Sequence, residues 1–140
     1  MSYRIVTTSY QQDQTGIQAV RRRVFIEEQG IDPTEEWDAH DVSAIFSIAL
    51  DDRDQAIGTA RLLKDGKIGR MAVLPEYRRQ GVGRAILQHL LAIARQQGYT
   101  RIQLSAQQSV IAFYAQQGFV PIGPPHEEVG IPHQNMQLML

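Results

Sequence analysis

The sequence contains no cysteine, and this absence removes several classes of chemistry at once. Without thiols there is no disulfide framework, no thiolate metal site and no cysteine nucleophile. Long apolar runs are also missing: no stretch approaches the roughly 18 residues needed to cross a bilayer, and the N-terminus lacks a signal-peptide core. A formal net charge of −1 argues against general nucleic-acid binding. We therefore expect a cytoplasmic protein with neither membrane nor nucleic acid as a partner.

The composition is typical of one globular domain. Hydrophobic residues make up 43% of the 140 residues, which is enough for a sizeable core, so residues 1–140 are expected to form a single domain. An Asp-Gly pair at 65–66 indicates a hairpin within an antiparallel meander. We predict an α/β (α+β) fold, with a mixed, mostly antiparallel sheet flanked by helices. The expected strands are 3–9, 43–50, 56–63, 67–74, 101–106, 120–122 and 136–140, and the expected helices are 13–29, 81–97 and 109–117.

An acidic segment, residues 31–42, follows the first predicted helix. It carries Glu35, Glu36, Asp38 and Asp41 around a tryptophan. Acidic clusters in loops are usually solvated, so we expect a loop or short helical turn with its carboxylates in water. The spacing of Asp38, His40 and Asp41 matches no common ligand pattern, and no metal site is predicted.

Residues 68–85 are the most informative part of the chain. An apolar strand runs through a proline-bearing loop into a turn rich in arginine and glycine, and this turn opens a long helix. Free backbone N–H groups at a helix N-terminus favour bound phosphate, and the arginines add positive charge at the same place. Gly81 and Gly83 let a ligand approach the main chain closely. The segment therefore predicts a pyrophosphate site, although a glycine-rich turn can also serve only to start a helix.

The spacing of the glycines narrows the choice of ligand. No Lys-Ser or Lys-Thr pair follows them, as a Walker A loop would require. A dinucleotide fingerprint needs a third glycine and an acidic residue about 20 residues later, and both are missing. What remains is Arg78-x-x-Gly81-x-Gly83. This pattern resembles the acetyl-CoA-binding motif of the GNAT superfamily of N-acetyltransferases.

A second motif lies about thirty residues further on. Phe113-Tyr114-x-x-x-Gly118-Phe119 resembles a segment that follows the fifth strand in GNAT enzymes. Its phenylalanines could also be core residues and its glycine a helix stop, but the order of the two motifs favours the superfamily. The segment from Arg21 to Gln29 and that from Gly130 to Met136 resemble the small ElaA/YjcF-like subgroup. The resemblance covers nearly the whole chain.

The resemblance implies a reaction and a cosubstrate. A primary amine of a small molecule would attack the thioester of acetyl-CoA directly, without a covalent enzyme intermediate. The pyrophosphate would lie at the loop and the pantetheine arm would pair with the strand before it, where the Val73 N–H would polarise the acetyl carbonyl. The implied cosubstrate-binding residues are Met71, Ala72, Val73, Arg78, Arg79, Gln80, Gly81, Val82, Gly83 and Arg84.

The candidate catalytic residues are Tyr114, Glu28 and His133. Tyr114 is the candidate general acid for the departing thiolate, because tyrosine with its ordinary pKa of about 10 stays protonated at neutral pH. The alternative is a buried tyrosine that only satisfies a backbone group. Many relatives carry a glutamate in the fourth strand as the base, and residues 68–72 contain none.

The identity of the base therefore stays open. Glu28, His133, Glu127, Glu128 or a chain of waters could accept the proton. Glu28 could instead hold Arg21 or a loop N–H, and His133 could be a structural residue in a turn set by the proline before it.

Two other functions and one assembly question also stay open. The fold could serve as a non-catalytic CoA-binding sensor or interaction domain, or transfer another acyl group such as propionyl or succinyl. A homodimer is one expected arrangement, since the final strand, 136–140, could pair across an interface or only complete the sheet.

Overall fold

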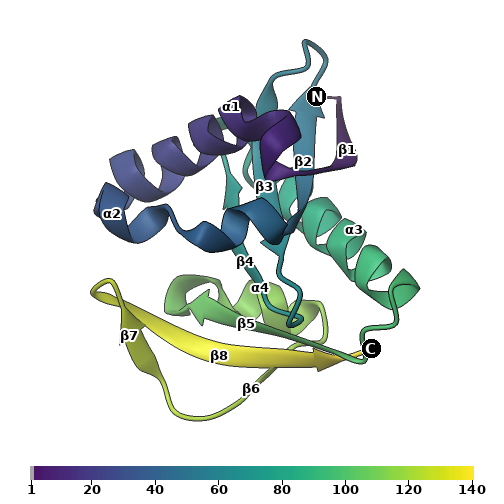
Figure 1. The fold of residues 1–140 in the computed structure, drawn as a ribbon. Helices are drawn as coiled ribbons and strands as arrows, with labels where there is room; N and C mark the ends of the chain where they lie inside the picture. Colours follow the sequence, from purple (N-terminus) through teal and green to yellow (C-terminus); the bar gives the residue numbers. More distant parts are fainter. Residues whose placement is uncertain (1) are drawn as a thin grey trace.

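The computed structural model describes residues 2–140 (Figure 1). Its strands are β1 (Tyr3–Thr8), β2 (Ile45–Asp51), β3 (Ala56–Leu62), β4 (Ile68–Val73), β5 (Arg101–Gln107), β6 (Val120–Pro121), β7 (His126–Glu128) and β8 (Ile131–Met139). Its α-helices are α1 (Tyr10–Arg21), α2 (Pro33–Glu36), α3 (Val82–Gln96) and α4 (Ile111–Gln116). A π-helical segment, η1 (Arg22–Glu28), continues α1, and short 3₁₀ turns are η2 (Ala39–Ser43), η3 (Pro75–Tyr77) and η4 (Gln108–Val110).

The strands form two sheets that touch at one end. The first has the antiparallel order β1-β2-β3-β4, and the second has the order β5-β8-β6 with β7 paired to β8. Among the described residues, a parallel bridge between Lys67 and Gln103 links the sheets, and the Gln103 N–H donates to the Gly66 carbonyl at 3.0 Å. Beyond this point β4 and β5 separate, as Figure 1 shows. The predicted mixed α/β fold, mostly antiparallel and flanked by helices, is confirmed, with its sheet split in two.

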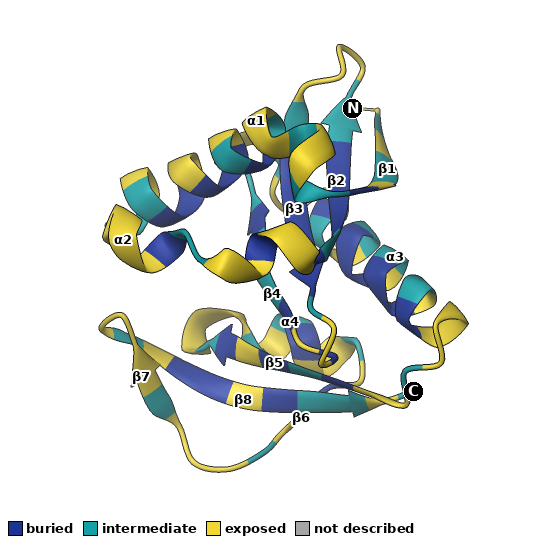
Figure 2. Ribbon diagram, viewed as in Figure 1, coloured by how far each residue is buried: buried dark blue, intermediate teal, exposed yellow. Residues whose placement is uncertain are grey.

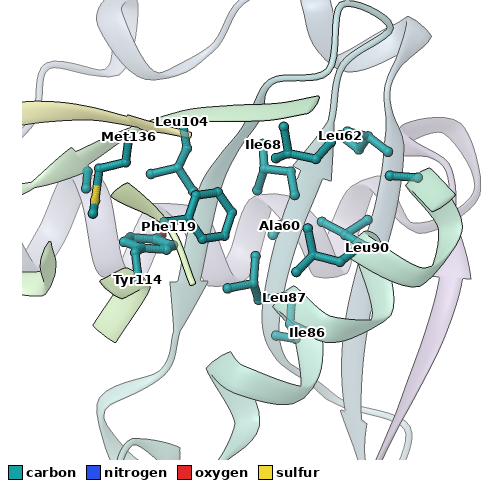
Figure 3. Close-up of a cluster of buried hydrophobic side chains, with 14 of the residues drawn as sticks. Ala60, Leu62, Ile68, Ile86, Leu87, Leu90, Leu104, Tyr114, Phe119 and Met136 are labelled. Atoms are coloured by element: carbon teal, nitrogen blue, oxygen red, sulfur yellow. The ribbon is translucent and has the colours of Figure 1, made fainter. Parts of the chain in front are cut away.

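The hydrophobic core holds the two sheets together. On α3, Val82, Ile86 and Leu90 recur at helical spacing and are buried, so this helix packs along one face of the first sheet. Figure 3 shows Leu90 and Leu87 of α3 beside Ile68 of β4, with Leu104 and Met136 of the second sheet in the same cluster. The opposite face of the first sheet is covered by α1, whose buried side faces inward in Figure 2.

A β-bulge in β4 accounts for the divergence of the two sheets. Thr59 pairs with Ala72 and Arg61 with Gly69, so Ala60 faces two residues of β4, at positions 70 and 71. Arg70 has φ +50°, a left-handed conformation that is uncommon for a residue with a side chain. A bulge bends its strand and increases its twist, and this one lies where β4 leaves β5.

The acidic segment differs from expectation. Glu36 and Asp41 are buried rather than solvated, because Arg21 reaches both: its Nε donates to Glu36 at 2.5 Å and a terminal nitrogen donates to Asp41 at 2.8 Å. Arg61 donates to Asp41 and Asp38, each at 2.8 Å. Buried charges are tolerated when they are paired and hydrogen-bonded, and here arginines from α1 and β3 supply the partners. The prediction of solvated carboxylates is therefore wrong for Glu36 and Asp41, while Glu35 is exposed as expected and Asp38 is partly buried.

The ends of several elements also differ. The first helix begins at Tyr10, because the Ser9 side chain accepts from the Gln12 N–H, and its C-terminal part is the π-helical η1. The final strand begins at Ile131 rather than at 136, since a tight turn at 129–130 folds β7 back against it. Pro132 lies in this strand and not in a turn, past the end of β5, where its missing N–H removes no bond to β5. The strand completes the second sheet by pairing with β5.

Within residues 2–140, no helix combines the length and the apolar character that a membrane span requires.

Arg21→Met tests the buried ion network. It would leave Glu36 and Asp41 buried without their main partner, so we expect a loss of about 3–5 kcal/mol in the free energy of unfolding. The matched control is Arg23→Met, which removes an exposed pair with Glu76 and should leave stability near that of the wild type. Urea denaturation of the two variants makes the comparison, and equal stabilities would contradict the structural role of Arg21.

Candidate active site

A cleft of about 1480 Å³ opens where β4 and β5 separate. Its walls come from η1, β4, the loop before α3, α4 and the second sheet. All the predicted site residues except Gln80 line it. Gln80 instead donates its side-chain amide to the Glu76 carbonyl at 3.1 Å, within the loop. The fold thus brings together residues that lie more than a hundred positions apart in the sequence, such as Glu28 and His133.

The start of α3 forms one end of the cleft. Its N-cap is Gly81, with φ +82° and no side chain to bind the first N–H groups. The Ala85 N–H donates to the Gly81 carbonyl at 3.0 Å, so the preceding N–H groups of Val82, Gly83 and Arg84 have no intrahelical acceptor. Donors of this kind at the positive end of a 15-residue helix suit a phosphate group.

The edge of β4 forms the middle of the cleft. The Leu74 N–H donates to the Ile57 carbonyl on β3 at 2.9 Å, so strand alternation turns the N–H and C=O of Val73 away from β3. The Val73 carbonyl accepts from Arg78 Nε at 2.9 Å. An extended ligand chain could add to this edge as a further strand.

Two ion pairs connect η1 to the loop before α3. Both carboxylate oxygens of Glu28 accept from Arg78, at 2.7 and 2.8 Å, and Arg23 forms a similar pair with Glu76 at 2.8 and 2.9 Å. The hydrogen bond from Arg78 lowers the pKa of Glu28 below its ordinary value. Glu28 therefore holds Arg78, and not Arg21, and its two oxygens are already in use.

Tyr114 lies in the wall opposite β4. Its ring packs edge-on against Phe113 and Phe119, with centroids 5.1 and 5.9 Å away, and Figure 3 shows it beside Phe119. Burial raises the pKa of Tyr114 to about 12, so the hydroxyl remains a donor at any physiological pH. It donates to Met71 Sδ at 3.7 Å, a weak acceptor. A ligand sulfur near this point could replace that partner.

His133 lies on the second sheet and is 7% exposed. Its Nδ1 is 2.7 Å from the Ile131 carbonyl, and because a carbonyl can only accept, Nδ1 carries the hydrogen. In the neutral imidazole, Nε2 is then the nitrogen with the lone pair. The ring lies beside that of His126, with centroids 6.1 Å apart.

The side chain of Arg70, at the bulge in β4, is held by residues in and just after α2. Arg70 donates to the Glu36 carbonyl at 3.2 Å and to Asp38 at 3.1 Å, and its Nε is 3.2 Å from the Glu36 carboxylate. Burial alone would raise the pKa of Asp38, but hydrogen bonds and attraction from Arg61, together with Arg70, hold that pKa at about 2.

Sequence reasoning missed several polar residues of the cleft. Ser105 and His126 both contact the Glu128 carboxylate, and Gln107 donates to Gln29 at 2.8 Å across the cleft. One signal was available, because residues 102–107 alternate apolar and polar side chains and so give β5 one polar face. The partners on β7 could not be identified, since the sequence did not predict that strand.

Comparison with known proteins agrees with this geometry. The family model for an acetyltransferase (GNAT) domain matches residues 7–140. The uncharacterized N-acetyltransferase YjcF of Bacillus subtilis (strain 168) is 32% identical over 121 residues, which cover 84% of this chain and 86% of that protein. An acyl-CoA N-acyltransferase from Pseudomonas aeruginosa is 28% identical, with a TM-score of 0.86 and coverage of 97% of this chain and 99% of the other. Escherichia coli ElaA gives the same TM-score and coverage at 23% identity.

The fold is therefore that of the acyl-CoA N-acyltransferases. The chain belongs to the GNAT acetyltransferase family, and the predicted resemblance to YjcF and ElaA is confirmed. As a member of this family it is an acyltransferase that uses an acyl-CoA cosubstrate.

The ion network beside the bulge should respond to acid. Because the pKa of Asp38 in the folded protein, about 2, lies below its ordinary value of 3.8, its contribution to stability is complete above about pH 4. It is lost as the pH falls through about 2. We expect the free energy of unfolding to fall between pH 4 and pH 2, and to fall less steeply in Asp38→Asn. Urea denaturation at several pH values in this range measures the free energy of unfolding. If it falls equally steeply with pH in both proteins, the role of Asp38 is contradicted.

Proposed function

We propose that the protein transfers the acetyl group of acetyl-CoA to a primary amine of a small molecule by direct attack. The observation that carries this proposal is the order of three features along one cleft: unoccupied N–H groups at the start of α3, the free edge of β4, and the Tyr114 hydroxyl. A CoA thioester requires a phosphate site, an extended groove and a donor near sulfur, in that order. Membership in the GNAT family supports the use of an acyl-CoA.

The proposed binding mode uses the backbone more than side chains. The pyrophosphate binds the N–H groups of residues 79–84, and the pantetheine arm pairs with Met71, Ala72 and Val73 of β4. The N–H of Val73 then polarises the thioester carbonyl and stabilises the oxyanion that forms on attack; one such donor is typically worth about 2.7–4 kcal/mol of barrier. Arg78, held by Glu28, fixes the Val73 carbonyl and so the position of this strand end.

The proposed reaction first forms a C–N bond and then breaks the C–S bond of the thioester. The amine attacks as a free base, the oxyanion collapses, and CoA leaves as a thiolate that takes up one proton, while the amine loses one. Tyr114 donates to the departing sulfur. Since its pKa of about 12 exceeds that of an ordinary thiol, roughly 8.5, its larger contribution is a hydrogen bond to the developing thiolate rather than early transfer of the proton.

His133 is the proposed acceptor of the proton from the amine, directly or through a water. His133 and Tyr114 line the same cleft, and the orientation of the imidazole is fixed by the bond from Nδ1 to the Ile131 carbonyl. Glu28 is less suited to this task, because Arg78 engages both of its oxygens and lowers its pKa. We assign Glu28 to positioning Arg78.

A Gly83 variant tests the cosubstrate site. A Cβ at Gly83 would meet Phe113 and Val73 at an ordinary 3.7 Å, so substitution should preserve the fold. Gly83→Glu adds a negative charge beside the proposed pyrophosphate, and we expect acetyl-CoA affinity to fall about 100-fold in calorimetric titration. Gly83→Gln is the control of equal size, and should lose much less.

The same titration is repeated with ATP and NAD as unrelated ligands and with propionyl-CoA and succinyl-CoA as other acyl donors. We expect the protein to bind CoA esters selectively and to transfer the acetyl group to an amine faster than the other acyl groups. Binding without any thiol release across a broad amine panel would favour the non-catalytic alternative. Unchanged affinity in Gly83→Glu would contradict the proposed pyrophosphate site.

Tyr114→Phe tests the sulfur donor. The ring and its contacts with Phe113 and Phe119 are kept, so only the hydroxyl is lost. We expect kcat to fall about 100-fold while the Kd for acetyl-CoA changes little. Steady-state thiol release and calorimetry measure the two quantities. A kcat near that of the wild type, or an equal loss of both quantities, would refute the assignment.

A further inference from the structure

The half of the cleft that the cosubstrate does not use has a polar wall of its own. On β5, Gln103, Ser105 and Gln107 line the cleft, while Leu104 and Ala106 between them join the core. Strand pairing continues this polar face. Gln107 lies opposite His133 and Ser105 opposite Asn135, and His133 in turn lies opposite His126 of β7.

One carboxylate lies on this face, that of Glu128. Ser105 Oγ donates to Glu128 Oε2, and His126 Nε2 lies 2.6 Å from the same oxygen. Among residues 2–140 no donor is bound to the other oxygen, Oε1. Burial opposes ionisation, but the hydrogen bonds from Ser105 and His126 hold the pKa of Glu128 below its ordinary value. Glu128 is therefore an ionised, oriented acceptor, and its side chain is 45% exposed and lines the cleft.

Apart from the two histidines, the remaining polar groups on this wall are amides and one hydroxyl. Gln103, Gln107, Asn135 and Ser105 can each donate and accept a hydrogen bond. Hydroxyl groups of a ligand have the same double capacity and could bond to several of them at once. An apolar ligand would offer no hydrogen bond to the amides of Gln103 and Asn135 as they leave water, which costs binding energy.

Among residues 2–140, the cations on the facing wall already have carboxylate partners. Arg61 and Arg70 are paired with carboxylates of residues 36, 38 and 41, and Lys67 lies 3.8 Å from the Asp65 carboxylate. An amino acid would have to break one of these ion pairs to bind through its carboxylate. A polyamine would find Glu128 for one ammonium group, and among residues 2–140 the second-sheet wall has no other carboxylate that lines the cleft; Glu35 lines the opposite side.

We propose that this face binds the acceptor as a polyhydroxylated primary amine of the amino-sugar class, with Glu128 Oε1 holding its ammonium group. The proposal rests on the acetyl-CoA-dependent transfer proposed above. His133, with its ring beside His126, then takes the proton from the bound ammonium before attack.

The experiment uses the whole protein and four defined amines. Thiol release from acetyl-CoA is measured with glucosamine, with cyclohexylamine as a ring of the same size without hydroxyls, and with L-lysine and putrescine. Rates are compared per mole of free amine. We expect kcat/KM for glucosamine to exceed that for each of the others at least about tenfold, as a few lost hydrogen bonds would require. Equal or better turnover of cyclohexylamine, L-lysine or putrescine would overturn the acceptor class.

Glu128→Gln and Glu127→Gln form a matched pair on β7. Glu127 is the neighbouring residue, does not line the cleft, and is exposed. We expect Glu128→Gln to raise KM for glucosamine at least about tenfold, with kcat and the Kd for acetyl-CoA nearly unchanged, while Glu127→Gln changes none of them. An unchanged KM in Glu128→Gln would refute the ammonium site.

Calorimetry with acetyl-CoA distinguishes failure of the acceptor proposal from failure of the proposed transferase reaction. If acetyl-CoA binds but none of the amines is acetylated, the acceptor class is wrong while the cosubstrate site stands. If acetyl-CoA does not bind to the folded protein, the proposed transferase reaction fails, and this inference fails with it.

Discussion

The separation of β4 from β5 is the constraint on which the rest of the structure depends. Two parallel strands that are adjacent in a sheet would ordinarily bond along their length and bury the space between them. Here the extra residue in β4 opposite Ala60 bends that strand away after the bridge between Lys67 and Gln103. The backbone of β4 beyond the bulge is left with an open edge inside the protein. A cleft with an extended groove follows directly from this one irregularity.

An open, bent strand needs support, and the buried ion network supplies it. Arg70 holds a left-handed backbone conformation that its side chain would not adopt freely, and its guanidinium is bound by the α2 backbone and by Asp38. Asp38 is bound in turn by Arg61, which also holds Asp41, and Arg21 closes the network from α1. The acidic segment thus supports the bulge, with three arginines balancing three carboxylates, of which Asp38 and its partner Arg70 remain partly exposed.

Much of this architecture could be predicted from local signals. The meander over β2–β4, the helix that begins at Gly81 and the strand after it were readable, because turn residues and hydrophobic spacing report short-range structure. The residues proposed to bind the cosubstrate come from one continuous segment, so the sequence could group them for the same reason. The buried carboxylates could not, because Arg21 and Arg61 come from distant elements. Nor could β7, which exists only because residues 129–130 reverse the chain.

The elements that line the cleft differ in what they contribute to the stability of the fold. Among the described residues, β7 places no side chain in a hydrophobic cluster, whereas β4 and α3 place several. Exposed substitutions outside a core usually change stability little. The β7 part of the cleft can therefore vary between related proteins without loss of the fold, while the segment from β4 into α3 is held by packing. A few changes in this short surface strand would alter the lining of the cleft and leave the core intact.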